Sequence, residues 1–113
     1  MPPRYLFHGT SLDYLDQIEQ QGLKAITYDK VFLASDCYIA LEYAKYRITH
    51  RQCNSFTPVV LVIDALQMYV DGFTFEELSY GEYVINKVPP EYIIDSIIDD
   101  EELLLAHYAQ EQL

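Results

Sequence analysis

The chain has 113 residues, of which 50% are hydrophobic and 22% charged, and its formal net charge is −11. This length suits a single domain over residues 1–113, and the apolar content excludes wholesale disorder. No stretch approaches the ~18–20 apolar residues of a membrane span, and the excess of acid disfavours binding to nucleic acid through charge alone. The opening Met1-Pro2-Pro3-Arg4 has no apolar signal core, so we expect a cytoplasmic protein with reduced cysteines and no membrane partner.

In chain order, the first expected element is a short strand over residues 5–7 that ends at His8-Gly9. Thr10 or Ser11 can then cap a helix whose apolar residues Leu12, Leu15 and Ile18 recur at helical spacing. Gly22 follows this helix, where a residue of left-handed conformation commonly ends a helix.

A second strand is expected over residues 31–34, and Ser35 or Asp36 can cap a helix over about 37–50. The run 59–63 is Val-Val-Leu-Val-Ile, which is typical of a strand buried on both faces. Residues 71–81 are expected to form a loop with one helical turn at 74–78.

A further strand is expected to start at residues 83–85, and Pro89-Pro90 stops it. The last strand is expected at residues 93–98. Asp99 or Asp100 then caps a terminal acidic helix, in which acids in the first turn suit the helix dipole. Mostly strands with few helices between them favour an α+β fold.

The charge is unevenly distributed along these elements. Residues 1–51 hold six acidic and six basic residues, whereas 52–113 hold twelve acidic residues and only Lys87 as a base. Three of the basic residues, Lys45, Arg47 and Arg51, lie close together and can hold a pyrophosphate. The acidic second half is either a solvated surface or a docking face for a basic partner.

Three segments carry candidate chemistry. His8-Gly9-Thr10 is either a strand-end turn or a ligand site, in which His8 hydrogen-bonds a sugar hydroxyl and Gly9 lets a ligand approach the backbone. The tyrosines of the second helix are either a core stripe or flat surfaces that stack on a heterocycle: Tyr38, Tyr43 and Tyr46. Glu82 enters an apolar strand, where a carboxylate is costly unless it is paired or used.

Other chemistries find little support in the sequence. There is no phosphate-binding glycine loop, no HExxH motif and no CxxC pair, and the histidines lack metal-ligand spacing, so we expect no metal. Cys37 is a weak candidate nucleophile, since only a possible helix N-terminus would lower the pKa of its thiol.

In this order, the segments resemble the ADP-ribosyltransferase superfamily, on the diphtheria-toxin and poly(ADP-ribose) polymerase side with its His–Tyr–Glu signature. His8-Gly9-Thr10 is similar to the first motif, and Glu82-Tyr83-Val84-Ile85 to the third. The span from Ile18 through Gly22-Leu23 and Val31 to Ala44 is similar to the helix, the strand and the tyrosine-bearing helix between them. Two stretches are also similar to small bacterial relatives of the superfamily, which include RNA 2′-phosphotransferases and DNA-modifying toxin transferases. These stretches are Phe7-His8-Gly9-Thr10 to Gly22-Leu23 and Val88-Pro89-Pro90-Glu91-Tyr92-Ile93.

The resemblance implies a split antiparallel sheet flanked by a few helices, with NAD as co-substrate. His8 would bind the adenosine-ribose hydroxyls, Gly9 the nicotinamide carboxamide, and Tyr43 would stack on the nicotinamide ring. Glu82 would hydrogen-bond the 2′-hydroxyl of the nicotinamide ribose. Thr10, Ser35 and Arg47 complete the expected NAD-binding set.

This chain departs from the family pattern in two places. The apolar stretch 32–34 replaces the family's first tyrosine, and Tyr80 stands where arginine-modifying members carry a carboxylate or an amide. RNA 2′-phosphotransferases rely on basic residues and do not use the motif glutamate, so Glu82 argues for the other branch.

The leading hypothesis is therefore an NAD-dependent mono-ADP-ribosyltransferase that acts on a macromolecular acceptor, protein or nucleic acid, as a bacterial or phage toxin or effector. The first alternative is an NAD-using repair enzyme of the RNA 2′-phosphotransferase kind. The second is an inactive binding module whose acidic face docks a basic partner such as an antitoxin.

Overall fold

The computed structural model describes residues 2–25, 30–50, 57–79 and 81–98, except for the side chains of residues 47, 49 and 50. Its main element is a six-stranded sheet in the order β5-β6-β3-β1-β4-β8, in which every neighbouring pair is antiparallel. The strands of this sheet are β1 (Tyr5–Ser11), β3 (Val31–Ala34), β4 (Pro58–Asp64), β5 (Glu76–Glu77), β6 (Glu82–Ile85) and β8 (Ile93–Ile98).

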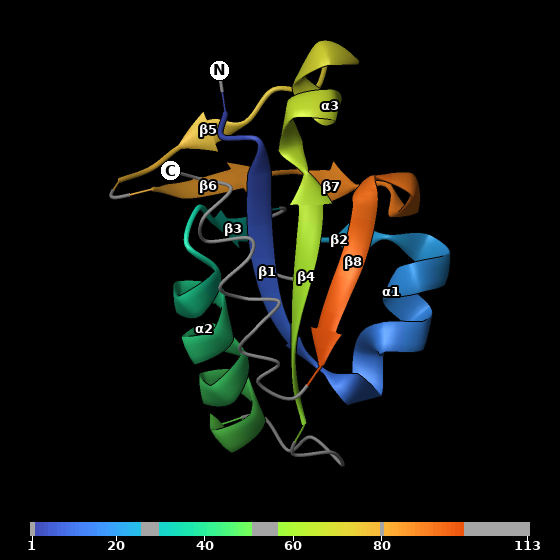
Figure 1. Ribbon diagram of the computed structural model, residues 1–113, viewed down its shortest axis with the longest axis vertical. Helices are drawn as coiled ribbons and strands as arrows, with labels where there is room; N and C mark the ends of the chain where they lie inside the picture. Colours follow the sequence, from blue (N-terminus) through green and yellow to red (C-terminus); the bar gives the residue numbers. More distant parts are fainter. Residues whose placement is uncertain (1, 26–29, 51–56, 80, 99–113) are drawn as a thin grey trace.

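The remaining elements flank this sheet (Figure 1). A separate two-stranded sheet pairs β2 (Leu23–Lys24) with β7 (Lys87–Val88), and the helices are α1 (Leu15–Gln21), α2 (Cys37–His50) and α3 (Ala65–Val70). Two 3₁₀ turns cover Leu12–Tyr14 and Pro90–Tyr92. The α+β prediction, with an antiparallel sheet and few helices, is confirmed.

The six-stranded sheet consists of two parts that meet at a single residue pair. Every residue of β1 pairs with β4, from Tyr5 opposite Asp64 to Ser11 opposite Pro58, whereas β1 pairs with β3 only through Phe7 and Ala34. In Figure 1, β1, β4 and β8 run along the length of the molecule, and β3, β5 and β6 run across it. The strands β1 and β3 therefore diverge on one side of this pair.

Strand β4 is the centre of the core. Its residues 59–63 have no exposed surface. Val59, Leu61 and Ile63 belong to one apolar cluster, together with residues of α1 and α3, while Val60 and Val62 belong to a second cluster with α2. The prediction of a strand buried on both faces is confirmed, because helices cover both sides of it.

Helix α2 lies directly on β1 at Gly9. A Cβ atom added to Gly9 would collide with the carbonyl oxygen of Ala40 and would lie 2.8 Å from the backbone nitrogen of Ala44. Ala40 and Ala44 are themselves almost fully buried. Three small residues thus let the helix backbone contact the strand backbone.

Other predicted elements also agree with the structure. The strands at 31–34 and 93–98 and the helix at 37–50 have the predicted bounds, and Glu82 begins β6. Asp36 caps α2, because its Oδ1 accepts a hydrogen bond of 2.8 Å from the amide of Tyr38. Gly22 ends α1 with a φ of +76°, and a Cβ there would collide with the carbonyl of Val88.

The predicted end of the first strand is wrong. Strand β1 continues through His8, Gly9 and Thr10 to Ser11, because each of these residues pairs with β4. The chain then makes a 3₁₀ turn before α1 begins at Leu15, and the Ser11 side chain makes no capping hydrogen bond. Long-range pairing extends the strand beyond the local turn signal.

The predicted helical turn at 74–78 is also wrong, because Glu76 and Glu77 pair with β6 as strand β5. A helix that the sequence analysis did not predict, α3, follows β4, and Asp64 caps it by accepting a hydrogen bond of 3.1 Å from the amide of Gln67. The predicted acidic helix from Asp99 or Asp100 lies outside the described residues.

We predict that Gly9→Ala destabilises the protein by at least about 3 kcal/mol, near the upper end of the usual cost of overpacking a core. The new methyl group would push α2 away from β1, since its obstacle is backbone and not a flexible side chain. Urea unfolding followed by circular dichroism would measure the change in the free energy of unfolding.

Ser11→Ala is the control in the same strand. Ser11 is 1% exposed, and within the described part of the chain its hydroxyl has no hydrogen-bond partner. Removal of an unsatisfied buried hydroxyl should be neutral or should stabilise the protein by about 1 kcal/mol. Equal stability of Gly9→Ala and the wild type would show that the fold does not depend on the close packing of α2 against β1.

Candidate active site

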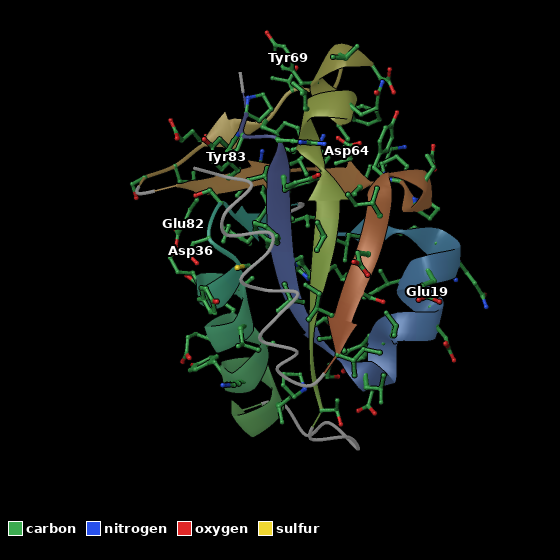
Figure 2. The ribbon with its side chains drawn as sticks, viewed as in Figure 1. Glu19, Asp36, Asp64, Tyr69, Glu82 and Tyr83 are labelled. Carbon is green, nitrogen blue, oxygen red and sulfur yellow. The ribbon has the colours of Figure 1, made fainter. Side chains whose placement is uncertain are left out.

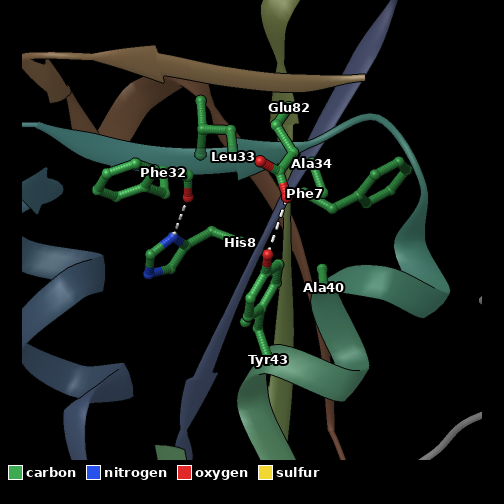
Figure 3. Close-up of a pocket in the computed structure, with 9 residues that line it drawn as sticks. Phe7, His8, Phe32, Leu33, Ala34, Ala40, Tyr43 and Glu82 are labelled. Carbon is green, nitrogen blue, oxygen red and sulfur yellow. Dashed lines mark hydrogen bonds between the residues drawn. The ribbon is translucent and has the colours of Figure 1, made fainter. Parts of the chain in front are cut away.

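A pocket of about 280 Å³ opens where β1 and β3 diverge, near the lower limit of the volumes usual for small-molecule sites. Strands β1, β3 and β6 and helix α2 all contribute to it, as Figure 3 shows. The residues that line it are Phe7, His8, Gly9, Phe32, Leu33, Ala34, Ala40, Tyr43 and Glu82. Four residues selected from the sequence, His8, Gly9, Tyr43 and Glu82, thus meet in one pocket.

His8 bridges the opening between the two diverging strands. Its Nδ1 lies 2.9 Å from the backbone oxygen of Phe32. Because a carbonyl oxygen can only accept, Nδ1 carries the proton and donates it. In the neutral ring Nε2 is then a hydrogen-bond acceptor, suited to a ligand hydroxyl.

Glu82 enters the pocket from the first position of β6, where it pairs with Ala34 of β3. Figure 2 shows it above the N-terminal end of α2. The hydroxyl of Tyr43 donates a hydrogen bond of 2.8 Å to Oε1 of Glu82 (Figure 3). This bond from α2 gives the carboxylate a defined position at the strand opening.

The hydrogen bond also changes the acidity of the tyrosine. It raises the pKa of Tyr43 above its ordinary value, because ionisation would remove the donated proton; partial burial and the negative charge of Glu82 add to the effect. The phenol is therefore protonated at neutral pH and acts as a donor to the carboxylate.

The turn before Glu82 is held by Ser35. The Ser35 amide donates a hydrogen bond of 2.9 Å to the carbonyl of Gly81, and the amide of Glu82 donates one of 3.0 Å to the carbonyl of Ser79. Gly81 has a φ of +78°, and a Cβ there would collide with the Ser35 hydroxyl. Ser35 thus supports the backbone that carries Glu82 and does not itself line the pocket.

Thr10, another predicted NAD contact, does not line the pocket. Thr10 is 2% exposed and pairs with Val59, so it belongs to the sheet interior. The side chain of Arg47 lies outside the described residues, and so does all of Arg51. Lys45 is exposed on α2.

Phe32 is a lining residue that the sequence analysis did not assign to the site. It is 49% exposed and lies between the buried Val31 and Leu33. Within the apolar stretch 32–34, which replaces the family's first tyrosine, Phe32 places an aromatic ring at the pocket. The alternation of inward and outward residues in a strand is the signal that indicates this position.

The tyrosines of α2 do not form a core stripe. Tyr38, Tyr43 and Tyr46 are 43%, 50% and 60% exposed. Cys37, by contrast, is buried, and its burial, followed by the charge of Asp36, raises the pKa of its thiol. A raised pKa argues against a thiolate nucleophile at neutral pH.

The described residues show neither a metal-binding cluster nor a membrane-spanning helix. Among them, no group of three or more His, Cys, Asp or Glu side chains is arranged to hold a metal ion. None of the helices within these residues combines the length and the apolar character needed to cross a membrane.

Comparison with known proteins finds probable RNA 2′-phosphotransferases among the relatives of this chain. The chain is 33% identical over 93 residues to a probable RNA 2′-phosphotransferase of Pectobacterium atrosepticum and 35% identical over 92 residues to one of Agrobacterium fabrum. It is 33% identical over 92 residues to one of Streptomyces coelicolor. These matches cover 81–82% of this chain and 45–47% of each relative. No family model matches the chain.

The chain thus spans about half the length of the curated relatives it matches. The names of these relatives describe transferases, which agrees with the resemblance to RNA 2′-phosphotransferases found in the motifs. The similarity extends over most of the elements that form the pocket, since it covers four-fifths of the chain.

We predict that Glu82→Ala lowers the pKa of Tyr43 toward its ordinary value, because the variant lacks the acceptor and the negative charge that raise it. NMR titration of tyrosine-labelled protein would follow the ring signal of Tyr43 with pH and so measure its pKa. In the wild type, the stability gained from this bond is present below the pKa of tyrosine in the unfolded chain, about 10. It is lost as the pH rises through the higher folded value.

Glu77→Ala is the matched control on the neighbouring strand. Burial and a hydrogen bond to Glu77 raise the pKa of Tyr83. The control should lower the pKa of Tyr83 and leave that of Tyr43 unchanged. An unchanged Tyr43 titration in Glu82→Ala would show that the two side chains do not interact in solution.

Proposed function

We propose that this chain is an NAD-using transferase of the RNA 2′-phosphotransferase kind, and that the pocket holds the nicotinamide end of NAD. The observation that carries the proposal is the meeting of His8, Gly9, Tyr43 and Glu82 in one pocket. The similarity to curated RNA 2′-phosphotransferases over 82% of the chain supports RNA as the acceptor.

In the proposed reaction, the bond between nicotinamide and the ribose C1′ breaks, and its electron pair leaves with the nicotinamide nitrogen. The nitrogen is cationic in NAD, so this departure needs no proton. An oxygen of the acceptor, the 2′-phosphate in the case of RNA, forms the new bond to C1′. The protein therefore has to stabilise a ribose that carries positive charge in the transition state.

In this chain Glu82 is the residue placed to provide this stabilisation, a role for which the RNA 2′-phosphotransferase pattern does not use the motif glutamate. Its carboxylate is partly exposed at the pocket and, among the described residues, accepts a hydrogen bond from Tyr43 at Oε1. In the proposed complex it accepts a second hydrogen bond from the 2′-hydroxyl of the ribose. Charge that is already in position costs no reorganisation when the transition state forms.

The other lining residues position the substrate. The half-exposed rings of Tyr43 and Phe32 offer flat surfaces to the nicotinamide. Gly9 presents backbone without a side chain, and Nε2 of His8 accepts from a ribose hydroxyl. Arg47 follows Tyr43 by one helical turn in α2, and we assign it to the pyrophosphate.

A second candidate function is favoured by Glu82 itself. Within the described part of the chain, the pocket is lined by a carboxylate and by no lysine or arginine. A carboxylate suits transfer of ADP-ribose to an acceptor better than it suits the binding of a phosphate. Mono-ADP-ribosylation of another macromolecule is therefore the alternative for the same site.

We predict that Glu82→Gln lowers the rate of nicotinamide release by ~10²–10³-fold, the usual effect of removing one group that stabilises developing charge. The affinity for NAD should change little, because the amide keeps the shape of the side chain. Chromatography of samples quenched at successive times would measure the rate of nicotinamide release. Calorimetry with NAD would measure the affinity.

Glu77→Gln is the control, since Glu77 is an exposed carboxylate on the adjacent strand outside the pocket. Its variant should release nicotinamide at the wild-type rate. Full activity of Glu82→Gln would contradict the role of Glu82, and absence of NAD binding by the wild type would contradict the proposed function.

The acceptor can be identified by incubating the protein with NAD labelled in its adenylate group. We predict that NAD is consumed with single-stranded RNA that carries a 2′-phosphate and is not consumed with the same RNA lacking it. Label that becomes attached to protein or to unphosphorylated nucleic acid would favour mono-ADP-ribosylation instead.

A further inference from the structure

The backbone of Glu82 is fixed, but its carboxylate lies several rotatable bonds farther out. Glu82 pairs with Ala34 of β3, and its amide donates a hydrogen bond of 3.0 Å to the carbonyl of Ser79. Its carbonyl accepts a hydrogen bond of 2.8 Å from the amide of Leu78. These contacts set the position of the main chain. The rotamer of a half-buried glutamate is left open by them, and restricting it costs conformational entropy.

The hydroxyl of Tyr43 provides the contact that holds the carboxylate itself. It donates a hydrogen bond of 2.8 Å to Oε1 of Glu82 (Figure 3). Tyr43 belongs to α2, whose backbone rests against Gly9 at Ala40 and Ala44, so the donor comes from a closely packed part of the molecule. The bond occupies one oxygen of the carboxylate and leaves the other able to accept from a ligand hydroxyl.

The ring and the hydroxyl of Tyr43 make separate contacts. The ring lines the pocket and is 50% exposed, so it offers a flat surface to a ligand. The hydroxyl is directed to Glu82. A phenylalanine at this position would keep the first contact and lose the second.

We propose that the hydroxyl of Tyr43 is a positioning group, which keeps the carboxylate of Glu82 in the rotamer that faces the nicotinamide ribose. This inference rests on the proposed function, because it assumes that Glu82 stabilises the ribose during nicotinamide departure. Such stabilisation is effective when the charge is in place before the transition state forms. A carboxylate that samples several rotamers is in place for only part of the time. The hydroxyl thus acts through Glu82 and contacts none of the reacting atoms.

The first test compares Tyr43→Phe with the wild type in kcat for nicotinamide release and in affinity for NAD. We predict that kcat falls by about 10- to 100-fold, the scale of loss that a misplaced catalytic group causes. The affinity, measured by calorimetry, should stay within about twofold, because the aromatic face is kept. Tyr43→Ala should weaken NAD binding as well, since it also removes the ring.

A double-mutant cycle determines whether the hydroxyl acts through Glu82. In the Glu82→Ala background, Tyr43→Phe should change kcat by less than about twofold, because no carboxylate remains to be positioned. A loss as large as in the wild-type background would show that the hydroxyl acts independently of Glu82, and the inference would be wrong.

Tyr83→Phe is the matched control. Tyr83 follows Glu82 in β6 and pairs with Glu77 of β5, and burial together with a hydrogen bond to Glu77 raises its pKa. The variant therefore loses the same kind of bond one residue away, outside the pocket. Its kcat should equal that of the wild type. An equal fall in Tyr83→Phe and Tyr43→Phe would point to a general weakening of β6 and would contradict a specific role of Tyr43.

NMR measures the rotamer of Glu82 directly, without NAD. Three-bond couplings about χ1 in isotope-labelled protein should have the values of one staggered rotamer in the wild type and averaged values in Tyr43→Phe. Identical couplings in the two proteins would overturn the inference.

The two proposals fail in different ways. A wild type that releases nicotinamide, with full kcat in Tyr43→Phe, would overturn the positioning role and leave the proposed function standing. A wild type that binds no NAD would overturn the proposed function and, with it, the catalytic purpose of the bond, whereas the NMR comparison would still decide whether Tyr43 positions Glu82.

Discussion

The contact between α2 and β1 at Gly9 determines where the other parts of the site lie. Without a side chain at Gly9, the backbone of α2 rests against the strand at Ala40 and Ala44. Tyr43 precedes Ala44, so this contact sets the distance between its hydroxyl and Glu82. A hydrogen bond of 2.8 Å weakens steeply when its atoms separate, and the pocket depends on how closely the helix approaches.

The division of the sheet provides the space for the pocket. Beyond the pair of Phe7 and Ala34, β1 stays paired with β4, while β3 stays paired with β6. The side chain of His8 donates to the carbonyl of Phe32 at the point where β1 no longer pairs with β3. A side-chain contact thus replaces strand pairing, and the strand ends remain open to a ligand.

The uneven charge of the chain has a counterpart in the site. His8, Gly9 and Tyr43 come from the neutral first half, and Glu82 comes from the acidic second half. The pocket therefore combines a mostly apolar wall with one carboxylate. This composition suits a sugar that develops positive charge, as in the proposed reaction.

Much of the fold was predictable from local patterns. The helix at 37–50 follows from its cap and its apolar spacing, and the strand at 59–63 follows from a continuous apolar run. The motif residues His8, Tyr43 and Glu82 were also identifiable as chemical types. Their meeting in one pocket was implied by the family resemblance and by no local pattern, because His8 and Glu82 are separated by more than seventy residues of chain.

The sequence by itself determined the fold class, most elements and three of the polar residues that line the pocket, since spacing and composition act over a few residues. Only the tertiary structure decided that β1 continues past His8, that Glu76 and Glu77 pair as a strand, and that Phe32 faces the pocket. Each of these outcomes depends on a partner distant in the chain. Pairing between strands fixes backbone and side-chain directions that local propensity leaves open.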